Sequence, residues 1–82
     1  MENQQIFDKL NLIVKSINGN AVLNENTALI GDSILDSLEF MNYITKVEES
    51  FEISISDSEI NRLQLGILGN MANYISSKTS KN

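Results

Sequence analysis

Residues 36–51 read DSLEFMNYITKVEESF, and the order of the apolar residues in this stretch decides the fold. Successive side chains are rotated by about 100° around a helix axis, which brings the apolar positions of this stretch into one stripe. The stripe consists of Phe40, Tyr43, Ile44, Val47 and Phe51. The pattern predicts a helix from Ser37 to about Ser50 with this face buried.

Two apolar side chains near the start of this helix fall outside the stripe. Leu38 lies more than about 100° from it, and Met41 lies at its edge, toward the same outer side as Thr45. The polar residues on that outer surface are Glu39, Asn42, Glu48 and Glu49. The pattern therefore predicts an apolar pair near solvent. The ordinary explanation is that single exposed leucines are common, or that a loop covers them.

The region before this helix contains a further helical pattern and a long loop. From about Asn3, a candidate N-cap, to Asn18 the apolar residues recur at helical spacing, and Asn18-Gly19 offers a left-handed stop. The apolar positions are Ile6, Phe7, Leu10, Ile13, Val14 and Ile17. From Gly19 to about Asp36 no period is sustained, and loops of this length are usually functional or held by their own apolar residues. Those residues are Val22, Leu23, Leu29, Ile30, Ile34 and Leu35.

After residue 51 the sequence predicts a connector and a short helix. Ile53 and Ile55 alternate with polar residues, but no second segment has a matching pattern, so we expect an extended connector rather than a strand. Ser56 and Glu59 have the spacing of a capping box, which predicts a short helix to about Leu63.

A last helix is expected from about Gly66 to Ser77, followed by a frayed tail over residues 78–82. Its buried residues would be Ile67, Leu68, Met71, Ala72 and Ile75. Together these elements predict one all-α domain over residues 1–82, because a chain this short builds only one core. The expected architecture is a four-helix bundle with three longer helices, one short helix and a long first loop.

The composition excludes several classes of function. The chain contains no cysteine and no histidine, which removes disulfides, thiolate metal sites and Ser-His or Cys-His catalytic pairs. We therefore expect neither an enzyme nor a metal protein. The net charge of −5 disfavours nucleic acid and favours basic partner proteins, although acidity that serves only solubility explains it equally well.

Membrane and secretory signals are also missing from the sequence. No apolar run approaches the ~20 residues that cross a bilayer, and MENQQIFDKL has neither the basic region nor the apolar stretch of a signal peptide. We therefore expect a cytoplasmic protein without a membrane span.

Ser37 is the candidate functional residue, because it lies where the long loop meets the start of the strongest helix. The first N–H groups of a helix lack internal partners and carry the positive end of its dipole, so a phosphodiester on Ser37 would be favoured there. The alternative is that Ser37 is only a helix N-cap, which contributes about 1 kcal/mol.

The pattern around Ser37 resembles the acyl carrier protein family over most of the chain. In that family Asp-Ser-Leu opens the second helix and Glu-Glu-x-Phe closes it. The matching residues here are Asp36-Ser37-Leu38, Val47-Glu48-Glu49, Phe51, Ile55, Asp57 and Glu59, with Thr27-Ala28-Leu29-Ile30-Gly31-Asp32 upstream and Tyr74-Ile75 near the end. The last helix is shifted by an insertion of about two residues.

The resemblance implies a non-catalytic, monomeric carrier. A phosphopantetheinyl transferase with its own magnesium ion would attach a 4′-phosphopantetheine arm from coenzyme A to Ser37. The thiol of the arm would hold an acyl or aminoacyl group supplied by a loading enzyme and used by a downstream synthase or transferase. Asp36 would serve transferase recognition, or would only supply negative charge at a helix start.

The resemblance also implies partner-binding residues, which are Leu38, Glu39, Met41, Thr45, Glu48 and Glu49. The carboxylates would steer basic partners, or would only solvate a helix face. Several residues depart from the pattern of fatty-acid carriers, namely Phe40, Asn42, Tyr43, Thr45, Lys46 and Ser56. The pathway thus stays open between fatty acid, polyketide, peptide and cell-envelope biosynthesis. The alternative function is an unmodified helical interaction module in which Ser37 is only a cap.

Overall fold

Residues 3–79, which a computed structural model describes, form four helices and no β-strand. The helices are α1 (Asn3–Ile17), α2 (Ser37–Phe51), α3 (Asp57–Arg62) and α4 (Leu68–Thr79). The predicted all-α class, with three longer helices, one short helix and a long first connection, is confirmed for these residues. None of the four helices has the length and apolarity that crossing a bilayer requires.

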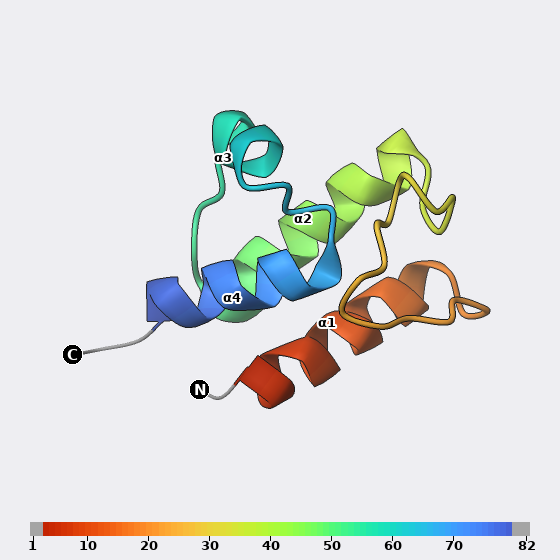
Figure 1. Ribbon diagram of the computed structural model, residues 1–82, viewed down its shortest axis with the longest axis horizontal. Helices are drawn as coiled ribbons and strands as arrows, with labels where there is room; N and C mark the ends of the chain where they lie inside the picture. The colour runs from red at the N-terminus through yellow and green to blue at the C-terminus, as the bar shows by residue number, and fades with distance from the viewer. Residues whose placement is uncertain (1–2, 80–82) are drawn as a thin grey trace.

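Helix α1 packs against both α2 and α4 and runs in the opposite direction to each of them (Figure 1). The core lies between these three helices. Helix α2 contributes the whole predicted stripe, and every one of its five members is buried. The other helices contribute Ile6, Leu10, Val14, Leu68, Met71, Ala72, Tyr74 and Ile75. Helix α3 has no buried residue, which fits its short length.

The long loop between α1 and α2 is held against the core by its own apolar residues, as predicted from the sequence. Leu29 and Leu35 are buried in the core, whereas Val22 and Ile30 are exposed. The loop also pairs with the segment before α4, because the Leu29 N–H donates to the Gly66 carbonyl at 2.8 Å. A single antiparallel bridge, Ala28 with Ile67, lies beside that bond.

The predicted bounds of α4 are wrong by two residues at each end. The helix begins at Leu68 rather than Gly66, because the Gly66 carbonyl and the Leu68 N–H both bond to the loop, the latter to Thr27 at 3.1 Å. It extends to Thr79, so Lys78 is helical instead of frayed. The rest of the predicted tail, residues 80–82, lies outside the described residues.

The ends of α1 also differ from the sequence prediction. Asn3 is already helical, and its amide donates to Asn73 on α4 at 2.6 Å instead of capping the helix. No glycine in residues 3–79 has a positive φ, so the expected left-handed stop at Asn18-Gly19 is wrong. Asn18 instead ends the helix with its side chain, which accepts from the Asn20 N–H at 3.1 Å and donates to the Ile34 carbonyl at 2.9 Å.

The connector and α3 follow the sequence prediction closely. Residues 53–56 form an irregular connector and not a strand. The side chain of Ile55, which is only 9 % exposed, anchors this connector to the core. Ser56 caps α3 in a capping box with Glu59, as predicted, and the helix ends at Arg62, one residue before the expected Leu63.

Candidate functional site

Asp36, and not Ser37, caps helix α2. Asp36 has extended backbone angles, and its Oδ1 accepts from the Glu39 N–H at 2.8 Å. The Glu39 carboxylate reciprocates, because its Oε1 accepts from the Asp36 N–H at 2.9 Å. The interpretation of Ser37 as the N-cap is therefore wrong. The Asp36 carboxylate already accepts from the Glu39 N–H, so this N–H cannot serve as the donor to a capping hydroxyl on Ser37.

Ser37 is the first helical residue of α2, and it is exposed. Its hydroxyl has no hydrogen-bond partner in residues 3–79, so it is free to react. The backbone N–H groups of Ser37 and Leu38 also have no carbonyl partner in that part of the chain. They point out of the positive end of the helix dipole, where a phosphate oxygen would be stabilised.

A shallow hollow of about 400 Å³ lies beside Ser37. Its wall is the end of the long loop, which folds back on itself because the N–H groups of Ile34 and Leu35 both donate to the Leu29 carbonyl at 2.9 Å. The lining residues are Ile30, Ser33, Ile34, Leu35, Asp36, Ser37 and Glu39. An open hollow beside a free hydroxyl leaves room for a phosphodiester-linked arm, so the residues present fit such a group.

The predicted apolar pair is exposed, and the loop does not cover it. Leu38 is 80 % exposed and Met41 is 50 % exposed. Ile30, which is 49 % exposed, adds a third apolar side chain that the sequence prediction did not assign to this site. In the sequence, Ile30 could be noticed only as an apolar residue within a polar loop. Leu38, Met41 and Ile30 are called the apolar rim below, and the role of the first two in partner binding stays a prediction.

The four polar residues that were predicted to bind partners have different environments in the structure. Glu39 is half-buried and is part of the capping box. Glu48 holds the connector after α2, because its Oε2 accepts from the Ile55 N–H at 2.8 Å. Thr45 donates its hydroxyl to the Met41 carbonyl at 3.1 Å. Glu49 is exposed and has no hydrogen bond or ion pair in residues 3–79, so it is the carboxylate most available to a basic partner.

A second hollow of about 380 Å³ lies between the long loop, α2 and α3. It shares Ile30 with the hollow beside Ser37, and its wall on α2 is Phe40. The Phe40 ring contacts Tyr43, with 5.8 Å between ring centroids. The remaining lining is mostly apolar and consists of Ala28, Leu29, Gly31, Ile60, Asn61, Gln64, Gly66 and Ile67.

Tyr43 was predicted only as an apolar member of the α2 stripe, but its side chain also places a phenol hydroxyl in the core. It is fully buried, and its hydroxyl has no hydrogen-bond partner in residues 3–79. Burial raises the pKa of Tyr43 far above its ordinary value of 10.0, because the charged phenolate would lose its hydration. No group of three or more metal-ligating side chains is assembled within the described residues.

Comparison of the chain with models of protein families, with curated proteins and with solved structures found no match.

Proposed function

We propose that this protein is an acyl carrier protein that holds acyl or aminoacyl groups as thioesters on a 4′-phosphopantetheine arm attached to Ser37. The observation that supports this most is the exposed hydroxyl of Ser37, which the capping carboxylate of Asp36 leaves without a hydrogen bond. The sequence around it, Asp36-Ser37-Leu38, is the centre of a resemblance to the carrier family that extends over most of the chain.

The attachment needs the hydroxyl of this chain, coenzyme A as the donor of the arm, and a transferase. The Ser37 Oγ attacks the phosphate of coenzyme A that carries pantetheine, a new O–P bond forms, and the bond to the adenosine bisphosphate leaving group breaks. The hydroxyl proton passes to the transferase. When bound, the arm supplies the thiol that this cysteine-free chain lacks.

The residues around Ser37 have separate tasks in this proposal. The free N–H groups of Ser37 and Leu38 stabilise the phosphodiester, and the box of Asp36 and Glu39 keeps the start of the helix rigid. The apolar rim contacts the transferase, the loading enzyme and the downstream synthase in turn. Glu49 attracts basic side chains of these partners. The carrier is a monomeric cytoplasmic protein.

The runner-up is an unmodified helical interaction module. The exposure of the apolar rim favours it as a second candidate, since such a surface also fits a partner protein that needs no prosthetic group. Its other element, a capping role for Ser37, is contradicted by the cap at Asp36.

One experiment separates the two functions. The protein is incubated with coenzyme A and a broad-specificity phosphopantetheinyl transferase, and its intact mass is measured. A carrier gains one phosphopantetheine, Ser37→Ala gains none, and Ser33→Ala, which changes another exposed serine of the same hollow, gains one. If the native chain gains nothing while a known carrier is fully loaded in the same tube, the carrier proposal is wrong and the interaction module remains.

A further inference from the structure

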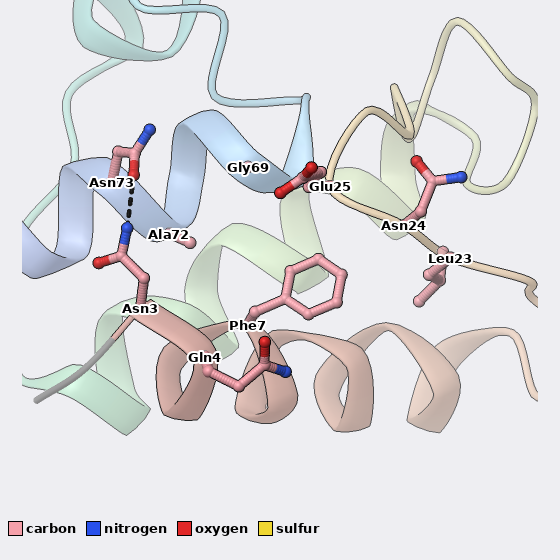
Figure 2. Close-up of a pocket in the computed structure, with 9 residues that line it drawn as sticks. All are labelled: Asn3, Gln4, Phe7, Leu23, Asn24, Glu25, Gly69, Ala72 and Asn73. Carbon is pink, nitrogen blue, oxygen red and sulfur yellow. Dashed lines mark hydrogen bonds between the residues drawn. The ribbon is translucent and has the colours of Figure 1, made fainter.

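A third hollow, of about 370 Å³, lies away from Ser37 between the first turns of α1, the turn at residues 23–25 and the first turns of α4 (Figure 2). It is built from three segments that are far apart in the sequence. The lining residues are Asn3, Gln4, Phe7, Leu23, Asn24, Glu25, Gly69, Ala72 and Asn73. None of these residues takes part in the function proposed above.

The wall that carries Glu25 is held rigidly against α4. The Gly69 N–H donates to the Glu25 carbonyl at 2.8 Å, and a Cβ atom on Gly69 would lie 2.8 Å from that same oxygen. Only glycine therefore allows this approach of loop and helix. The turn is also fixed internally, because the Asn24 N–H donates to the Thr27 hydroxyl at 2.9 Å and Thr27 is buried.

The floor of the hollow is apolar, and its rim is rich in hydrogen-bond acceptors. Figure 2 shows Phe7 rising from α1 toward α4, with Ala72 above it. Gln4 donates its amide to Asp8 at 2.9 Å, and Asn3 donates its own to Asn73 at 2.6 Å (Figure 2). The side-chain oxygen of Gln4 therefore keeps its acceptor capacity within the described part of the chain, whereas that of Asn3 points away from Phe7 and Glu25 (Figure 2).

Among residues 3–79, Glu25 is the only acidic residue that lines the hollow, and no basic residue of that range lines it. Its carboxylate is exposed and has no hydrogen bond or ion pair in residues 3–79. An occupant that matches this arrangement has an aliphatic stem for the apolar floor, a positive charge for Glu25, and donors for the Glu25 carboxylate and the Gln4 oxygen. A guanidinium has five donors and a flat face that stacks on an aromatic ring such as that of Phe7.

We propose that this hollow is a docking site for an arginine side chain of a basic partner protein. Arginine is favoured over lysine because the ammonium of lysine has only three donors and does not stack. The net charge of −5 draws such a partner toward the chain, and the hollow supplies a defined contact. The site requires no modification of Ser37, so it stands independently of the carrier function.

The test is a ¹H–¹⁵N NMR titration of the full, unmodified chain with Nα-acetyl-arginine methylamide. Saturable shifts are expected for the amides of Glu25, Gly69 and Ala72, which lie around the hollow. Glu25→Gln should weaken this binding by about two- to fivefold, as expected for the loss of one exposed ion pair. Glu52→Gln removes an exposed carboxylate after α2 that has no hydrogen bond or ion pair in residues 3–79, and it should leave the affinity unchanged.

Two further probes define what would overturn the proposal. The citrulline analogue has the shape of arginine without its charge, and the lysine analogue has the charge without the planar group; both should bind more weakly. Equal binding of the citrulline analogue, tighter binding of the lysine analogue, absence of shifts with arginine, or full binding to Glu25→Gln would each contradict it. Ser37→Ala should bind the arginine probe as the native chain does, so failure of the carrier function would not be mistaken for failure of this site.

Discussion

The starts of α2 and α3 use the same capping motif but leave their serines in different states. Residues 36–39 read DSLE and residues 56–59 read SDSE. In both, the first residue caps the helix and the glutamate three positions later closes the box. At α3 the serine comes first, so the Ser56 hydroxyl accepts from the Glu59 N–H at 3.2 Å and also lies 3.1 Å from its carboxylate. At α2 the aspartate comes first, and the hydroxyl of Ser37 is left free.

This difference shows that a serine at a helix start is not by itself evidence for either capping or modification. The order of two neighbouring residues decides which oxygen satisfies the helix N–H groups. The surroundings differ as well, since α2 carries the exposed Leu38 and Met41 near its serine, whereas the first two residues of α3 are polar and exposed.

The largest expected effect comes from exchanging the order of the two residues at α2. The double variant Asp36→Ser/Ser37→Asp reproduces the order found at α3 and keeps a capping box with Glu39. We expect loading with phosphopantetheine to be lost, while the free energy of unfolding changes by less than about 0.5 kcal/mol. Intact mass after the transferase reaction and urea unfolding measure the two quantities. Full loading of the double variant would show that the position of the hydroxyl is unimportant.

The second prediction concerns the exposed apolar side chains of α2. Leu38→Glu and Met41→Glu should leave the free energy of unfolding within about 0.5 kcal/mol of the native value, because both side chains are at least half exposed. Transfer by a cognate partner enzyme should slow by about tenfold, as expected for loss of an interface anchor.

Ser58→Glu is the matched control for Leu38→Glu, because Ser58 holds the equivalent second position of α3. It should change neither stability nor transfer. Unfolding of both rim variants would instead show that Leu38 and Met41 are core residues.

The third prediction separates the caps from the free serine. Asp36→Ala and Ser56→Ala should each lower the free energy of unfolding by about 1 kcal/mol, because each leaves a helix N–H without its partner. Asp36→Asn should restore most of the loss. Ser37→Ala should cost clearly less than either, because the Ser37 hydroxyl makes no hydrogen bond in residues 3–79. Urea unfolding compares the four variants, and an equal loss in Ser37→Ala would contradict the assignment of Asp36 as the cap.

The smallest expected effect is the pH dependence of the box at α3. The hydrogen bond from the Ser56 N–H lowers the pKa of Glu59 below its ordinary value of 4.5, and Lys78, 3.9 Å away, contributes to the same direction. Because the folded-state pKa is the lower one, the stabilisation by Glu59 is present above pH 4.5 and is lost as the pH falls through the folded-state pKa.

Glu59→Gln removes this contribution. The stability difference between the native chain and Glu59→Gln should therefore be greatest near pH 7 and shrink below pH 4.5. Urea unfolding at several pH values measures it, with Glu49→Gln as the exposed control. A difference that stays constant with pH would show that the carboxylate of Glu59 does not stabilise the fold.

The start of α4 shows where prediction from the sequence reached its limit. The capping box at Ser56 was predictable because its donors and acceptors lie within four residues. The first N–H groups of α4 instead bond to the Thr27 and Glu25 carbonyls, about forty residues earlier, and no local pattern reports such a pairing. The same contact explains why glycine occupies position 69. The hollow at Glu25 was likewise invisible in the sequence, since it joins three separate segments.

By itself, the sequence determined the four helices, the buried stripe of α2 and the exposure of Leu38 and Met41. These follow from patterns that act within one helix, namely a 3.6-residue period and, for α3, a capping box. Only the tertiary structure decided where α4 begins, which loop residues reach the core and what surrounds Ser37. These features depend on hydrogen bonds and packing between segments whose distance along the chain carries no information about their distance in space.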